Sequence, residues 1–234
     1  QTFILAGTAH EYAGRNQAFC QFDINGALIA KWSSQSQFVF EDHQERVNAI
    51  VLDESPTVPL LYVAGTNSGV NDLDFALSRY TKNGINQWVL DSSFGNNGYT
   101  TVAFNSLSDN ISSDDVATHL LMQNNGNLLV GGDSSWSENN LEFSHIRLME
   151  IDSAGQHLTQ WGTNNGQVSP YWGSIQPPLE YINENLAGLA LNSYEDIFIS
   201  GTASGSNNGS DQKVGVVTLL INDPLFSSSF NAPE

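Results

Sequence analysis

The sequence predicts an all-β protein, a β-propeller made of four-stranded blades. A short apolar run ending in glycine occurs four times along the chain. Strand-length apolar runs and turn residues recur around it in the same order, and no segment shows the apolar spacing of an amphipathic helix. Tandem four-stranded units without intervening helices are typical of a propeller.

The glycine-ended run is the anchor of each repeat. It reads Phe3-Ile4-Leu5-Ala6-Gly7 in the first copy, and its later copies end at Gly65, Gly132 and Gly201. An apolar run at residues 47–52, 116–122 and 186–191 precedes the last three anchors. We expect each such run to form the innermost strand of a blade and to pair with the anchor strand through a hairpin.

Two more strands are expected after each anchor. The first of them covers residues 18–22, 75–80, 145–151 and 214–221. A turn follows, in which Gly or Asn supplies positive φ, as in Asn25-Gly26, Asn83-Gly84 and Ala154-Gly155. The fourth strand carries an aromatic residue: Trp32, Trp88, Trp161 and Phe226. We expect the three tryptophans to pack between blades, and a carbohydrate-binding platform is the alternative.

This spacing predicts one domain over residues 1–234, with repeats at about 1–40, 41–98, 99–165 and 166–234. The first repeat has no apolar run for an innermost strand before Phe3. We therefore expect a segment of a larger ring, or a ring whose missing strand comes from a partner chain. The alternative is a small four-bladed ring with an imperfect seam.

Composition excludes several functions. The chain has 7 Lys and Arg against 25 Asp and Glu, a net charge of −18, so it offers no basic face to nucleic acid. No apolar run reaches the roughly 18 residues of a membrane span, so no membrane insertion is expected. The single cysteine, Cys20, excludes a disulfide within the chain.

Acidic residues stand just before each of the expected innermost strands. In a propeller they would lie at the mouth of the central channel, where a ring of carboxylates could hold Ca²⁺ or steer a basic partner. The alternative is a set of solvated carboxylates that keep the protein soluble. Whether a metal binds there is left unknown. The candidate residues are Asp42, Glu45, Asp114, Asp115 and Glu184.

Three aromatic residues depart from the repeat. Trp136, Tyr171 and Trp172 stand among Ser, Asn and Pro residues, in segments that we expect to be loops. Exposed aromatic side chains on loops are suited to contact a sugar or a protein. We therefore predict an exposed aromatic binding patch there.

One segment resembles a known family. Residues 91–98, Asp-Ser-Ser-Phe-Gly-Asn-Asn-Gly, are similar to the hallmark turn of the delta-60 repeat, a bacterial β-propeller repeat. Val63-Ala64-Gly65, Ser78-Arg79-Tyr80 and Gln123-Asn124-Asn125-Gly126 match its other motifs, whereas the third and fourth copies have drifted. The resemblance implies a secreted or surface-associated bacterial propeller, and it does not imply one activity.

The expected function is therefore non-catalytic binding or scaffolding in an extracellular, periplasmic or cell-surface assembly. The expected partner is a protein, or further copies of the chain, contacted through the loop faces. A calcium-assisted or carbohydrate-binding propeller is the alternative binding function, and no other cofactor is expected. A glycan-active hydrolase or lyase that uses Glu45, Asp115 and Glu184 is the catalytic alternative.

Overall fold

The computed structural model confirms the all-β prediction. It describes residues 1–11, 14–34, 45–68, 72–104, 113–138, 141–162, 166–169, 183–204 and 212–219. All regular elements in these segments are β-strands, and the strands form several antiparallel sheets. No helix that could span a membrane is found among them.

The first sheet has three antiparallel strands in the order β1-β2-β3. These are β1 (Thr2–Glu11), β2 (Gly14–Asp23) and β3 (Leu28–Ser33). Among the described residues β1 pairs with β2 only, so one edge of β1 has no neighbouring strand.

The second sheet contains β4 (Arg46–Asp53), β5 (Leu60–Ser68), β6 (Leu73–Lys82) and β7 (Trp88–Leu90) in that order. Strand β8 (Tyr99–Val102) also pairs with β6. The turn at residues 91–98 therefore leads the chain from β7 back to the same neighbour, and two short strands share the outer position of this sheet.

Two further units of the same kind form the third sheet. The first unit has β9 (Asp114–Met122), β10 (Leu128–Glu138), β11 (Leu141–Ile151) and the short β12 (Gln167–Val168). The second has β13 (Asn183–Leu191), β14 (Ile197–Ser204) and β15 (Gln212–Leu219). A parallel bridge between Ser144 and Asn183 joins the two units into one seven-stranded sheet.

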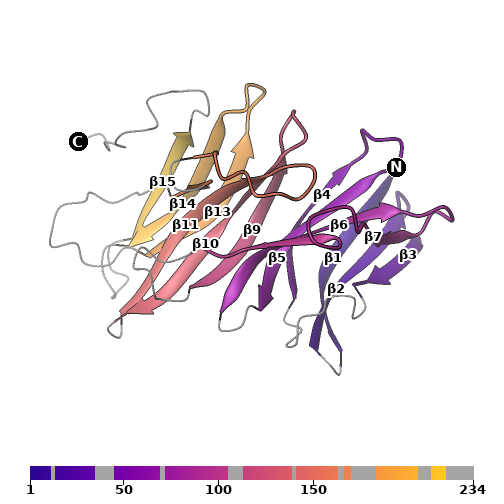
Figure 1. The fold of residues 1–234 in the computed structure, drawn as a ribbon, viewed down its shortest axis with the longest axis horizontal. Coiled ribbons are helices and arrows are strands. Elements are labelled where there is room, and N and C mark those ends of the chain that lie inside the picture. Colours follow the sequence, from indigo (N-terminus) through magenta and orange to yellow (C-terminus); the bar gives the residue numbers. More distant parts are fainter. Residues whose placement is uncertain are drawn as a thin grey trace.

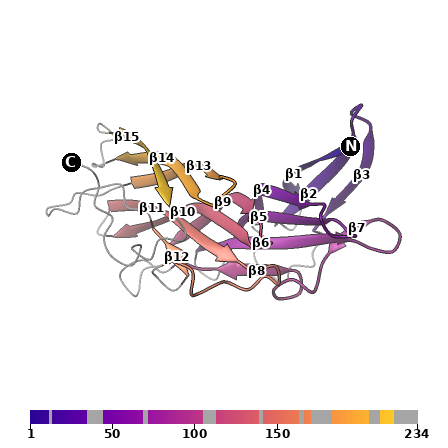
Figure 2. The same cartoon turned by 90° about the horizontal axis from the view of Figure 1, so that it is seen from above.

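The sheets follow one another along the long axis of the molecule in chain order. Figures 1 and 2 show the strands β1–β3 at one end and β15 at the other. The alternative of a small closed four-bladed ring is therefore not formed within the described segments.

Asx turns connect the strands where turns were predicted. In each turn, one side-chain oxygen accepts hydrogen bonds from two backbone N–H groups. The accepting residues are Asp23, Asn83 and Asp152. Gly26 and Gly155 adopt positive φ as expected. In the second copy the prediction for Gly84 is wrong, because Asn86 takes the left-handed position, with φ of 63°. Asparagine tolerates this region better than most residues.

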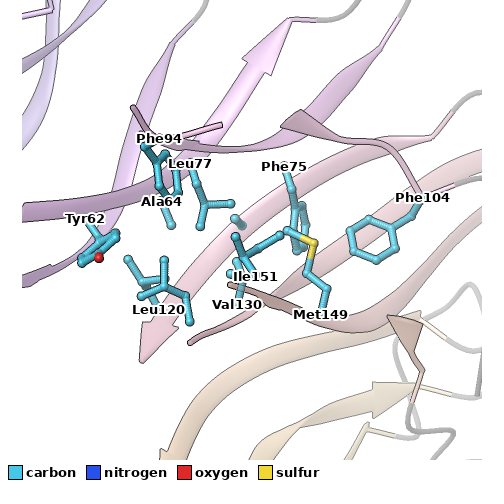
Figure 3. Close-up of a cluster of buried hydrophobic side chains, with 12 residues drawn as sticks. Tyr62, Ala64, Phe75, Leu77, Phe94, Phe104, Leu120, Val130, Met149 and Ile151 are labelled. Atoms are coloured by element: carbon cyan, nitrogen blue, oxygen red, sulfur yellow. The ribbon is translucent and has the colours of Figure 1, made fainter. Parts of the chain in front are cut away.

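Apolar clusters fill the spaces between successive sheets. The cluster between the second and third sheets brings Tyr62 and Leu77 against Leu120 and Val130, as Figure 3 shows. Phe94, from the turn at residues 91–98, is fully buried in the same cluster.

The repeated aromatics pack between the first two sheets as predicted. Trp32 stacks on Trp88 with 5.6 Å between ring centroids, and Phe19 also stacks on Trp32, at 5.0 Å. Trp161 also packs against an apolar cluster, although it lies in a turn and not in the expected strand. Phe226 lies outside the described residues.

Candidate functional site

The anchor glycines share one backbone arrangement. Gly65, Gly132 and Gly201 each lie opposite a β-bulge in the preceding strand. A methyl group on any of them would overlap a backbone carbonyl oxygen of that strand: Arg46, Val116 and Asn185, respectively. Only glycine allows so close an approach of two backbones. The recurring glycine is therefore a requirement of the paired inner strand, which the sequence pattern alone did not explain.

Three of the predicted acidic residues occupy equivalent places beside these bulges. Each stands two positions before the residue that pairs with the anchor glycine. Glu45 is 4% exposed, and Asp115 and Glu184 are fully buried. The alternative that these three carboxylates are solvated is therefore wrong.

Glu45 connects the first two sheets. Its Oε2 accepts a hydrogen bond of 3.0 Å from Ser34 Oγ, which follows β3. Burial raises the pKa of Glu45 to about 7. The carboxyl lines a small crevice between the sheets together with Gln17, Thr66 and Asn67.

Asp115 occupies the same place between the second and third sheets. It accepts a hydrogen bond of 2.7 Å from the backbone N–H of Phe104, beyond the end of β8. It accepts another, of 3.0 Å, from Ser113 Oγ. Burial raises the pKa of this carboxyl to about 7 as well.

Glu184 pairs with a histidine of the preceding unit. Its Oε2 lies 3.3 Å from Nδ1 of His145 on β11. On the neighbouring strand β10, Asp133 accepts a hydrogen bond of 2.7 Å from the N–H of Leu186. Burial raises the pKa of Asp133 to about 6.

The predicted ring of carboxylates is not assembled in the described part of the chain. Glu45, Asp115 and Glu184 begin three successive units, and each is hydrogen-bonded there to the unit before it. No group of three His, Cys, Asp or Glu side chains able to hold a metal ion occurs among the residues described. Asp114 is exposed, and its Oδ1 accepts the N–H of Leu73. Asp42 lies outside the described residues.

The predicted aromatic patch is described only at Trp136. This residue lies in β10 and not in a loop, because the β10–β11 hairpin extends to Glu138 and Leu141. Its half-buried ring stacks on Phe143 at 5.3 Å and lies 5.0 Å from the ring of His145. Tyr171 and Trp172 lie outside the described residues.

A partly buried ion pair between β6 and the turn at residues 91–98 was not predicted. Arg79 Nε donates to Asp91 Oδ2 at 2.8 Å, and its Nη2 donates to Ser93 Oγ at 2.8 Å. The guanidinium group lies 4.9 Å from the ring centroid of Phe94 and also donates to the carbonyl of Ser153, in the turn after β11. The only feature of the sequence that pointed to this ion pair was the match of these residues to the motifs of the delta-60 repeat.

The ion pair also sets the charge state of the turn. Burial opposes ionisation of Asp91, but hydrogen bonds from Ser93 and the charge of Arg79 outweigh it and hold its pKa below the usual range. The turn therefore joins the second and third sheets through the Arg79 guanidinium group, which donates hydrogen bonds to Asp91, Ser93 and the carbonyl of Ser153.

No protein-family model matches this chain, and no curated protein matches it. The similarity to the delta-60 repeat therefore stays a prediction that rests on the motifs quoted above.

Proposed function

We propose that this chain is a non-catalytic binding or scaffolding module that acts in an extracellular, periplasmic or cell-surface assembly. Its sheets would be blades of a β-propeller, or of an open propeller segment. Its partner would be a protein.

The regular joints between sheets support the propeller part of the proposal. A buried carboxylate, a bulge and a close-packed glycine recur at the start of the last three units. Apolar side chains of each later unit pack against apolar side chains of the unit before it. Such repetition, in which each unit contacts its neighbours, is the building rule of repeat proteins.

The uncovered face of the first sheet carries the binding part of the proposal. Phe3 and Leu5 stand four and two residues before their anchor glycine, and they are 44% and 58% exposed. The residues at the same two positions of the other units are at most 1% exposed. These are Leu61, Val63, Leu128, Val130, Ile197 and Ile199. Apolar surface left open in this way marks a site of protein contact.

The burial and separation of the acidic residues favour a binding function over a glycan-active enzyme. A glycosidase places two carboxyl groups on either side of one bond in an open cleft. Glu45, Asp115 and Glu184 instead lie buried at three separate joints, where each accepts hydrogen bonds from its own surroundings.

Site-specific photo-crosslinking in the producing organism tests the proposal. A photoreactive residue in place of Leu5 should give a discrete adduct with one protein, because this side chain lies on the uncovered face. The same residue in place of Tyr194, which is 80% exposed on a turn of the last unit, is the matched control. Adducts of the same kind from both positions, or none from Leu5, would contradict the proposal.

A further inference from the structure

We infer that the crevice between the first and second sheets is a binding site for one monovalent cation, of the size of sodium or potassium. The carboxylate of Glu45 and the side-chain oxygen of Asn67 would be its ligands from the protein, and water would complete its coordination. The crevice lies on the other side of the first sheet from Phe3 and Leu5. The inference therefore goes beyond the proposed function and does not depend on it.

The two ligands are neighbours at the start of the second sheet. The ladder between β4 and β5 ends with Arg46 opposite Thr66, so Glu45 and Asn67 are the next two residues on the two segments. Side chains at such opposed positions share one face, with their Cβ atoms about 5 Å apart. Val63, on the same face of β5, packs against the first sheet. Glu45 and Asn67 therefore meet in the crevice, which both of them line.

Both ligands are buried, and one of them lacks a partner. Asn67 is 3% exposed, and its Oδ1 has no hydrogen-bond partner among the residues that the structure describes. Glu45 accepts a hydrogen bond from Ser34 Oγ at its Oε2. A buried acceptor without a partner and a buried carboxylate without a counter-charge both cost free energy. A cation that both side chains coordinate removes both costs.

The equivalent carboxylates of the next two joints meet a different residue. Ser134, opposite Asp115, carries a hydroxyl group that can donate a hydrogen bond. Ala203 stands opposite Glu184, whose carboxylate lies 3.3 Å from the ring of His145. In the first joint, between the first and second sheets, the residue opposite the carboxylate instead has an unpartnered buried acceptor. An acceptor beside a carboxylate calls for a cation.

Ala76 leaves the space that the ion needs. It pairs with Gly65, as Arg147 pairs with Gly132 in the third sheet, so Ala76 and Arg147 hold equivalent positions. The guanidinium group of Arg147 extends to the second sheet and lies 6.0 Å from the ring centroid of Phe104. The shorter Ala76 lines the crevice, which has room for about one water molecule. A bound ion of that size would bring to the first joint the positive charge that Arg147 brings to the second.

A single positive charge matches this crevice. Among the described residues that line it, Glu45 has the only charged side chain. A monovalent ion neutralises this carboxylate, whereas a divalent ion would leave a net positive charge between two packed sheets. Carboxylate and amide oxygens are suitable ligands for such an ion, because they replace the oxygens of its water shell.

The site does not depend on what lies along the free edge of β1. In the second joint, the inner strand of the preceding sheet is present as β4. The described hydrogen bonds of Asp115 nevertheless come from Phe104 and Ser113, and none comes from β4. An inner strand beside β1 would therefore leave the surroundings of Glu45 as they are.

Thermal unfolding in different chloride salts tests the site. The measurement is made at pH 8, where Glu45, with a pKa of about 7, is ionised. Sodium and potassium chloride are compared with choline chloride at equal ionic strength, because choline is too large for a space of one water molecule. Sodium or potassium should raise the melting temperature by about 2–4 °C relative to choline.

Three substitutions should each remove this gain. Glu45→Gln removes the charge, and Asn67→Ser replaces the amide oxygen by the hydroxyl group found in the second joint. Ala76→Arg supplies a positive charge from the chain itself, as in the second joint. Asp114→Asn is the matched control, because it removes the same charge from an exposed carboxylate, and it should keep the gain.

Broadening of the sodium NMR signal by the folded chain gives a readout that does not involve unfolding. Glu45→Gln should reduce this broadening more than Asp114→Asn does. Equal melting temperatures in the three salts would overturn the inference and leave water as the occupant. A gain that Glu45→Gln or Asn67→Ser keeps, or equal broadening in Glu45→Gln and Asp114→Asn, would also overturn it, because the ions would then act on the acidic surface in general.

Discussion

Gly65 shows how a single residue determines whether two strands can pair. Its missing side chain leaves room for the Arg46 carbonyl, which the bulge in β4 directs toward it. Gly132 and Gly201 do the same for β9 and β13. Gly7 leaves the same space, but no described atom lies within 4 Å of the place that a methyl group would occupy there.

We predict opposite effects of alanine at these glycines. Gly65→Ala and Gly132→Ala should lower the free energy of unfolding by about 2–3 kcal/mol, because the methyl group forces the paired backbones apart. Gly7→Ala should leave it unchanged or raise it by about 0.5 kcal/mol, because alanine restricts the unfolded chain. Urea unfolding of the three variants measures this. A loss at Gly7 equal to that at Gly65 would show that the place beside Gly7 is filled.

The buried carboxyls predict a stability that falls with rising pH. The folded-state pKa of about 7 for Glu45 and Asp115 lies above the ordinary values of 4.5 and 3.8. The unfolded chain therefore loses these protons first, and the free energy of unfolding decreases as the pH rises from about 4 to about 7. The loss is at most about 3 kcal/mol for Glu45 and about 4 kcal/mol for Asp115.

Denaturant unfolding at pH 5 and pH 8 checks this dependence. The unchanged chain should be more stable at pH 5, and Glu45→Gln should reduce the difference between the two values. Asp114→Asn, at an exposed residue next to Asp115, is the control and should leave the difference as it was. A pH dependence that Glu45→Gln does not alter would contradict the role of burial at this carboxyl.

At the level of elements, the joint between the second and third sheets is both apolar and charged. The turn at residues 91–98 places Phe94 in the core and holds Asp91 against Arg79. Gly95 N–H also donates to the carbonyl of Ala154, at the turn after β11. The hallmark segment of the sequence is thus a connection between sheets.

Breaking this ion pair should be costly. Arg79→Ala leaves Asp91 partly buried without its cation, and we predict a loss of about 3 kcal/mol in the free energy of unfolding. Lys82 lies on β6, as Arg79 does, and its amino group lies over the ring of Trp88. Lys82→Ala should lower the free energy of unfolding by less than about 1 kcal/mol. Urea unfolding compares the two variants, and equal losses would contradict the structural role of the pair.

The strands and turns could be predicted from the sequence more fully than the contacts between one unit and the next. Apolar runs and turn residues located the strands and hairpins because both are local signals. Trp136 was misplaced, since a hairpin of polar residues such as Ser134 and Ser135 resembles a loop in sequence. The burial of Glu45 and Asp115 could not be predicted, because it depends on the sheet packed against each of them. The one sequence signal that distinguished Gly7 from Gly65 was the lack of an apolar run before Phe3.

At the level of the whole molecule, successive sheets repeat one joint without closing a ring in the described part of the chain. The first sheet and β15 lie at opposite ends (Figure 1). The acidic residues that a closed channel would gather stay apart at their separate joints. We therefore predict that calcium and EDTA leave the melting temperature unchanged, since a tight ligand would stabilise the folded state. A rise with calcium that EDTA reverses would contradict this.

Hydrogen exchange of the backbone amides, followed residue by residue, tests the free edge of β1 most directly. Amides that point away from β2 have no partner strand, so alternate residues of β1 should exchange rapidly. The amides of β5, which pairs on both sides, should stay protected. Protection of every amide of β1 to the level of β5 would show that this edge is covered, and would contradict the free edge that the structure gives to β1.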